Sequence, residues 1–231
     1  MGAYAADMPT VVLQERTFVS KVYGWMAFAL FVTAMVAMGV ANTPAVRNVV
    51  LGNRAIFFGL IIGELVLVIA LSAAIARISA ATATIMFVIY SAVNGLTLSV
   101  IFVVYTDASI ASTFFITGGT FAAMSVYGYF TKRDLTSIGN LCFMALIGLI
   151  LASLVNIFLQ NAMLYWVVTY VGILIFVGLV AYDTQRIKQI ARAGIEEGEA
   201  AQKGAILGAL RLYLDFINLF LLLLRIFGRR R

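Results

Sequence analysis

Residues 210–228 read LRLYLDFINLFLLLLRIFG, and this stretch decides the fold. It is long and apolar enough to cross a bilayer as a helix, yet it contains Arg211, Asp215, Asn218 and Arg225. An ionised side chain in hydrocarbon costs on the order of several kcal/mol, so such residues normally face a bundle interior or a wet cavity and pair there. The stretch therefore predicts a C-terminal helix at the centre of a membrane bundle.

The composition of the whole chain also indicates a membrane protein. Of its 231 residues, 63% are hydrophobic and 11% are charged, whereas a soluble domain is nearer half apolar and a quarter charged. The apolar runs show no alternation with period two, and they are about twice as long as a membrane β-strand. The expected fold is an all-α polytopic membrane protein that forms a single domain over residues 1–231.

Several classes of function lack the residues that they need. The chain has no histidine, which excludes zinc proteases of the H-E-x-x-H type and Ser-His catalysis. No glycine-rich nucleotide-binding motif is present, and the basic residues are scattered without an aromatic–basic pattern for nucleic acid. We therefore expect a protein that is not an enzyme, binds no cofactor and binds no nucleic acid.

Seven apolar runs meet the roughly 20-residue requirement for a membrane helix. Residues 1–21 precede them as a short surface segment, and the helical spacing after the sixth run predicts that this helix continues past the membrane. The predicted spans are about 22–42, 55–76, 80–104, 108–130, 138–159, 163–183 and 205–227.

The lysines and arginines of the short loops predict the orientation. Most of them lie in the N-terminal segment and in the loops after the second, fourth and sixth spans, which places the N-terminus in the cytoplasm. The basic tail Arg229–Arg231 conflicts with this count, because seven spans place it outside. Either the earlier loops outweigh the tail or the last helix is re-entrant. We favour a full span, because residues 205–227 are long enough to cross.

Two carboxylates are expected in the cytoplasmic half of the bundle. Asp183 ends the sixth span, and Asp215 lies about ten residues into the seventh, or roughly 15 Å along it. If the two approach each other, they share a proton and titrate as a unit, as a pH sensor, a gate or a cation site requires. Alternatively, Arg211 or Arg77 neutralises one of them and forms a structural clip.

Glu64 lies near the middle of the second span with no neutralising neighbour on its own helix. Arg225, near the outer end of the seventh span, has a side chain long enough to reach toward that depth. We expect a Glu64–Arg225 pair as an outer constriction. The alternative is a protonated, hydrogen-bonded Glu64. Asn94 and Asn218 are candidates for hydrogen bonds between helices.

Two runs resemble motifs of a known family. Residues 212–220, LYLDFINLF, followed by Leu-Leu-Arg at 223–225, resemble the C-terminal signature of the Bax inhibitor-1 family, also called the transmembrane Bax inhibitor motif family. The run Tyr182-Asp183-Thr184-Gln185 resembles the family's sixth-helix motif, and Glu64 fits its acid in the second span. The number of spans and their lengths match over essentially the whole chain.

The resemblance implies both a fold and a function. It implies seven helices with the last surrounded by the others, and a pH-sensitive calcium leak. Asp183 and Asp215 match the family's di-aspartyl sensor and become candidate contacts for Ca²⁺ as the transported or bound ion. Arg77 is the candidate for the arginine that locks the sensor. The short N-terminus suits a bacterial member in the inner membrane, and bacterial relatives are linked to a membrane-anchored AAA protease.

Two other functions are compatible with the same residues. A regulatory membrane protein could bind such a protease or a cell-death partner without transporting anything. Two aspartates within the membrane are also typical of intramembrane aspartyl proteases, which place the second one in Gly-x-Gly-Asp. Here Leu212-Tyr213-Leu214 precedes Asp215, so this alternative is remote.

Overall fold

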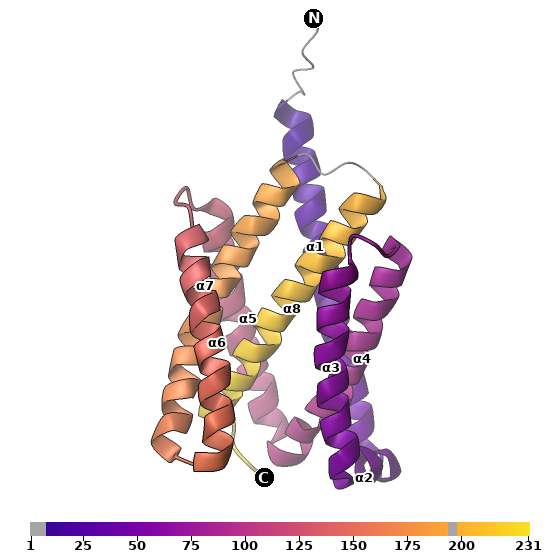
Figure 1. Ribbon diagram of the computed structural model, residues 1–231, viewed down its shortest axis with the longest axis vertical. Coiled ribbons are helices and arrows are strands. Elements are labelled where there is room, and N and C mark those ends of the chain that lie inside the picture. The colour runs from indigo at the N-terminus through magenta and orange to yellow at the C-terminus, as the bar shows by residue number, and fades with distance from the viewer. Residues whose placement is uncertain (1–7, 194–197) are drawn as a thin grey trace, which may run out of the picture. The chain divides into compact units, whose positions relative to one another are not determined.

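The structure is a computed structural model that describes residues 8–193 and 198–231 (Figure 1). Within these ranges the chain forms helices and no strand, and seven of the helices are long and apolar enough to cross a membrane. The all-α polytopic membrane fold is therefore confirmed. The helices are α1 (Met8–Asn42), α2 (Pro44–Gly52), α3 (Arg54–Ala74), α4 (Ala80–Val104), α5 (Asp107–Phe130), α6 (Thr136–Leu159), α7 (Ala162–Arg192) and α8 (Glu199–Phe227).

The observed helices match the predicted spans closely except near the N-terminus. Helix α1 begins at Met8 rather than at residue 22, because Pro9 is tolerated in the first turn of a helix and nothing after it stops the helix. The predicted spans do not include α2, which begins at Pro44 two residues after the end of the first span. Proline is also favoured at the first helical position, where its missing N–H is not needed. As expected, α7 continues past the predicted span, to Arg192.

The chain divides into two compact units, and α7 and α8 each contribute to both. Unit 1 comprises Met1–Val104 and Ile187–Tyr213, and unit 2 comprises Tyr105–Arg186 and Leu214–Arg231. A single domain over the whole chain stays a prediction.

In unit 1, α1 and α3 pack on α4. The contact between α1 and α4 depends on Gly95, because a Cβ there would lie 2.7 Å from the backbone oxygen of Thr33. The first part of α8 fits against α1 and the last part of α7 through Gly208, where a Cβ would meet Val22 and Ile187 at 3.3 Å. Tyr213, at the end of this part, is completely buried.

In unit 2, the second part of α8 packs against α5, α6 and α7. Ile175, Phe176 and Leu179 of α7 form a buried cluster with leucines of α8, and Cys142 of α6 packs on it. Of the most apolar 18 residues of α8, 72% are buried, the largest share among the seven spans. In each unit α8 thus has other helices around it, as the charges within it predicted.

The C-terminal tail lies beside the loop between α4 and α5. The N–H of Thr106 donates to the carbonyl of Arg229 at 2.9 Å, and Tyr105 forms a β-bridge with Arg230. Arg231 Nη2 lies 2.7 Å from Asp107 Oδ1. At the opposite end of α8, Glu199 accepts a hydrogen bond from the N–H of Ala80 at the start of α4. Helix α8 is therefore one continuous helix from Glu199 to Phe227, and the ion pair with Asp107 offsets part of the tail's charge. That this helix crosses the membrane in full stays a prediction.

Candidate functional site

The end of α7 in unit 2 carries the polar run 182–185, Tyr-Asp-Thr-Gln. Gln185 ties this run to the loop between α5 and α6. Its Nε2 donates to the carbonyl of Arg133 at 2.8 Å, and its Oε1 accepts from the N–H of Leu135 at 2.9 Å. Because unpaired backbone groups are costly when they are buried, the buried Gln185 fixes this end of α7 against the loop.

Two glycines let the same run approach the neighbouring helices closely. A Cβ at Gly128 of α5 would collide with the carbonyl of Ala181, and a Cβ at Gly139 of α6 would collide with the ring of Tyr182. Glycine lacks that atom, and small residues let helix backbones approach each other in lipid. Asp183 is therefore held on a part of α7 that is packed against two other helices.

Asp183 and Asp215 belong to the same unit. Asp183 is half-buried near the end of α7, and Asp215 on α8 is 5% exposed. Each has an interaction partner. In the part of the chain that the structure describes, no three acidic, cysteine or histidine side chains gather as a metal site. The direct pairing of the two carboxylates through a shared proton stays a prediction.

The residue after Asp215 packs on a face of α5 that is partly polar. The ring centroid of Phe216 lies 5.3 Å from that of Phe114 and 5.5 Å from that of Phe121. On the same helix the hydroxyls of Thr113 and Ser125 are buried, and neither has a hydrogen-bond partner among the described residues. Buried hydroxyls without a protein partner are groups that water or a passing ion can satisfy.

The residues proposed to support the carboxylates lie in different places. Arg211, four residues before Asp215, is in the part of α8 that belongs to unit 1, and it has an interaction partner. Arg77 is exposed just after α3 and, among the residues described, forms no ion pair. Asn218 donates to the carbonyl of Leu214 at 2.8 Å, within α8 itself rather than between helices. The roles of the two arginines stay predictions.

Unit 1 contains a chain of polar side chains that the sequence alone did not reveal. The hydroxyl of Tyr213 lies 2.7 Å from Thr33 Oγ1 and 3.2 Å from Asn94 Oδ1. Asn94 Nδ2 donates to one carboxyl oxygen of Glu64 at 3.3 Å, and Thr97 Oγ1 donates to the other at 2.6 Å. These hydrogen bonds therefore form a network of side chains that connects α1, α8, α4 and α3 in the membrane interior.

The hydroxyl protons of Thr33 and Tyr213 in this network can be arranged in two ways. Thr33 Oγ1 also lies 2.9 Å from the carbonyl oxygens of Ala29 and Ser91. Each hydroxyl has one proton to donate. Tyr213 donates either to Thr33, which then donates to a carbonyl, or to Asn94, in which case it accepts the proton of Thr33. The hydrogen bond between Thr33 and Tyr213 can therefore reverse its direction without a large movement of the atoms.

The surroundings of Glu64 agree with the hydrogen-bonded alternative for this residue. Both of its carboxyl oxygens have side-chain donors on α4. Arg225 is exposed near the end of α8, and its guanidinium lies 5.2 Å from the centroid of the Tyr165 ring. Because Glu64 belongs to unit 1 and Arg225 to unit 2, their pairing as an outer constriction stays a prediction.

Outside the spans, one carboxylate in the loop before α6 has a perturbed pKa. Asp134 Oδ1 accepts from the hydroxyl of Thr136 at 2.6 Å and from its N–H at 2.9 Å. These hydrogen bonds favour the ionised form and lower the pKa of Asp134 below its usual value. Asp134 is fully exposed, so it offers a comparison for carboxylates inside the bundle.

Comparison with known proteins gives a consistent result over nearly the whole chain. Residues 15–231 match the family described as inhibitor of apoptosis-promoting Bax1. The chain is 56% identical to the inner membrane protein YbhL of Escherichia coli K12, over 94% of this chain and 93% of that protein. It is 43% identical to an uncharacterized protein of Borreliella burgdorferi, over 95% of each chain. It is also 44% identical to an uncharacterized protein of Rickettsia prowazekii, over 94% of this chain and 91% of that protein.

Proposed function

Because this chain belongs to the Bax inhibitor-1 family, we propose that it is a pH-sensitive calcium leak channel. It acts in the bacterial inner membrane with its N-terminus in the cytoplasm, and it performs no enzymatic reaction. The observation that carries the proposal is the burial of Asp215, a carboxylate 5% exposed on the most buried of the seven spans. An ionisable group at this depth is retained at a cost, which marks ion pathways and proton relays.

The proposed gate is the pair Asp183 and Asp215. Two carboxylates that meet in a low-dielectric site do not both ionise readily, so the pair holds one proton and changes charge with pH. A change of one charge between α7 and α8 shifts a two-state equilibrium of helix positions. Arg77 or Arg211 stabilises the closed state by pairing with the ionised carboxylate.

The proposed cargo is Ca²⁺, which takes about six to eight oxygen ligands. The two aspartates supply only part of that shell, and water, together with hydroxyls such as those of Thr113 and Ser125, supplies the remainder. Conduction requires binding that is favourable enough for entry and weak enough for release. An incomplete protein shell suits an ion that passes better than one that stays.

The test is Ca²⁺ flux from liposomes that contain the purified protein, measured as a function of pH. Wild-type protein should release Ca²⁺ at a rate that changes with pH. Asp215→Asn and Asp183→Asn should each flatten this profile, because an amide keeps the shape of the carboxylic acid but does not titrate. The matched control is Asp134→Asn, the same chemical change on an exposed loop of the same unit, which should leave the profile unaltered.

A pH profile that survives in both aspartate variants would remove the gate from the proposal. Flux equal to that of protein-free liposomes would remove the channel itself. In that case the second candidate applies, a regulatory membrane protein that binds a membrane-anchored AAA protease or another membrane partner.

The second candidate is supported by two spans with little burial. Of the most apolar 18 residues, 6% are buried in α3 and none in α6. These faces are open to lipid or to another membrane protein. A photoreactive amino acid at Phe143, which is 61% exposed on α6, should crosslink a protein partner in native membranes if this candidate is correct.

A further inference from the structure

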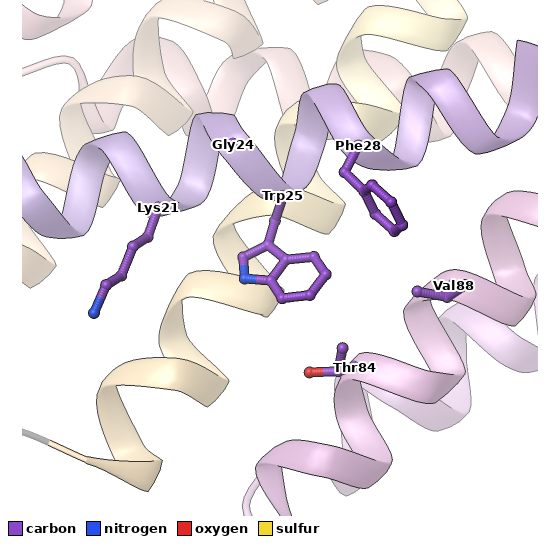
Figure 2. Close-up of a pocket in the computed structure, with 6 residues that line it drawn as sticks. All are labelled: Lys21, Gly24, Trp25, Phe28, Thr84 and Val88. Carbon is purple, nitrogen blue, oxygen red and sulfur yellow. The ribbon is translucent and has the colours of Figure 1, made fainter.

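An open groove lies between α1 and α4 in unit 1, at the end of α1 where the predicted span begins (Figure 2). Its volume is about 580 Å³, within the range of roughly 300–1,000 Å³ that is usual for ligand pockets. Trp25 and Phe28 extend from α1 toward the α4 residues of the groove, and Lys21 extends from α1 on the far side of Trp25 from those residues. The lining residues are Lys21, Gly24, Trp25, Phe28, Thr84 and Val88.

The interior of the groove is suited to hydrocarbon. Phe28 and Val88 present apolar surface, and the Phe28 ring packs edge-on against Trp25 with centroids 5.8 Å apart. The hydroxyl of Thr84 donates to the carbonyl of Ala80 in its own helix at 2.9 Å, so it makes no demand on an occupant. At Gly24, no atom lies within 4 Å of where a Cβ would stand, so the absent side chain leaves the groove open.

The polar end of the groove lies at the level of the lipid headgroups. From Lys21 to Asn42 the helix rises about 31 Å, close to the hydrocarbon thickness of a bilayer. Lys21 is therefore at the boundary, and Trp25 is about one turn inside it. The indole nitrogen of Trp25 lies on the side of the ring toward Lys21 (Figure 2).

The two donors at this end have no partner among the described residues. Lys21 forms no ion pair there, and the indole N–H of Trp25 donates no hydrogen bond. The carboxylates of Glu15 and Glu199, which belong to the same unit, are engaged elsewhere: Glu15 pairs with Arg192 at 2.6 Å and Glu199 with Lys203 at 3.2 Å. The groove therefore ends in a positive charge and an N–H that are both available to an anion.

We infer that this groove binds an anionic phospholipid of the surrounding membrane. One acyl chain lies along Trp25, Phe28 and Val88, and the phosphate interacts with the ammonium of Lys21 and the indole N–H of Trp25. A zwitterionic lipid fits less well, because among the residues that the structure describes the carboxylates of this unit near the groove are already engaged and leave its cationic headgroup without a partner. The inference rests on the groove alone and does not depend on calcium transport.

Quenching of Trp25 fluorescence tests the inference directly. The chain has two tryptophans, so a Trp166→Phe background leaves Trp25 as the single reporter. The protein is placed in phosphatidylcholine vesicles that contain the same mole fraction of either dibromo-phosphatidylglycerol or dibromo-phosphatidylcholine, whose bromine atoms quench an indole on contact. One lysine near an anionic surface contributes about 1 kcal/mol, so the selectivity for phosphatidylglycerol at Trp25 should be about fivefold.

Two variants and two controls complete the experiment. Lys21→Gln should bring the two lipids to near parity, and Gly24→Leu should reduce quenching by both, because leucine occupies the groove. Gly39→Leu is the matched control on the same helix, since Gly39 also has no atom within 4 Å of its Cβ position. Lys132→Gln removes an equal charge from an exposed loop residue of the other unit. Both controls should behave like the parent protein.

Three results would overturn the inference. These are equal quenching of the parent protein by the two lipids, a selectivity that survives Lys21→Gln, and quenching that is unaffected by Gly24→Leu. Lys21 is exposed, so its variant should fold and carry the test even if the leucine variant does not.

Discussion

Tyr213 and Asp215 lie two residues apart on α8, and the two side chains meet very different surroundings. Tyr213 is completely buried, and its hydroxyl has neighbours on α1 and α4 at 2.7 and 3.2 Å. Asp215 is also buried, on a helix whose other neighbours in unit 2 are the rings of α5 and the aliphatic cluster of α7. A neutral hydroxyl and an ionisable carboxyl thus lie within one turn of the same helix.

These different surroundings indicate how each part of α8 responds to a change of pH. The hydrogen bonds that join Tyr213 to Thr33 and Asn94 link neutral groups and are satisfied by either arrangement of the protons, so they fasten α8 to α1 and α4 over a range of pH. In the proposed gate the pair Asp183 and Asp215 changes its charge with pH, and a charge is costly in a low dielectric. We expect the first part of α8 to be a fixed anchor and the second part to be the part that moves.

The largest expected effect comes from separating α7 from α5 in unit 2. Gly128→Ala places a Cβ against the carbonyl of Ala181, and backbone atoms cannot rotate away as a side chain can. Overpacking of this kind should cost about 3 kcal/mol of stability. The measurement is the free energy of unfolding of the purified protein in detergent micelles.

The matched control for this substitution lies on the same helix. At Gly118 no atom lies within 4 Å of the Cβ position, so Gly118→Ala should be neutral or stabilising by up to about 1 kcal/mol. If the two alanine variants are equally stable, the close approach of α7 to α5 is not what holds Asp183 in position.

A smaller effect should come from removing the hydroxyl that anchors the first part of α8. Tyr213→Phe keeps the ring against Phe87 and Tyr90 but removes the link between Thr33 and Asn94. Hydrogen bonds between membrane helices contribute about 0.6 kcal/mol on average, and we expect a loss of about 1 kcal/mol here, because two partners are affected. The measurement is again the free energy of unfolding.

A double-mutant cycle separates the network from the loss of a single hydroxyl. Thr33→Val and Tyr213→Phe together should cost less than the sum of the two single variants, because both remove the same hydrogen bond. Tyr127→Phe, at a ring 45% exposed on α5, is the control and should change little. Strict additivity would mean that the hydroxyls of Thr33 and Tyr213 act independently.

The sequence predicted the parts of the fold that depend on the length of the apolar runs and on the free-energy cost of placing charged side chains in a membrane. Seven long apolar runs have few structural solutions in a membrane, and the charges of α8 required neighbouring helices. The same reasoning identified Asp215, because a carboxylate is conspicuous in an apolar run. It missed α2, since Pro44 is compatible with both the end and the start of a helix.

The hydroxyl network was beyond such reasoning for a physical reason. Thr33 and Thr97 carry no charge, and a hydroxyl within a membrane helix usually bonds to a carbonyl of its own helix, as Thr84 does. Only the register between helices brings Thr33 to Tyr213 and Thr97 to Glu64, and hydropathy does not encode that register. The contacts of the tail with the loop after α4 likewise depend on hydrogen bonds that a count of charges does not reveal.

The smallest expected effect concerns the ion pair at the end of α8, where charges meet water instead of hydrocarbon. Arg231 and Asp107 have side chains that are 50% and 76% exposed, so solvent and salt screen their attraction. Arg231→Gln should therefore lower stability by less than about 1 kcal/mol, and the loss should shrink as the salt concentration rises. Unfolding measured at low and high salt provides the check. A loss as large as that of Tyr213→Phe and independent of salt would show that the hydrogen bond from Arg231 Nε to the carbonyl of Tyr105, at 3.1 Å, matters more than the ion pair, and that the anchoring of α8 extends beyond its first part.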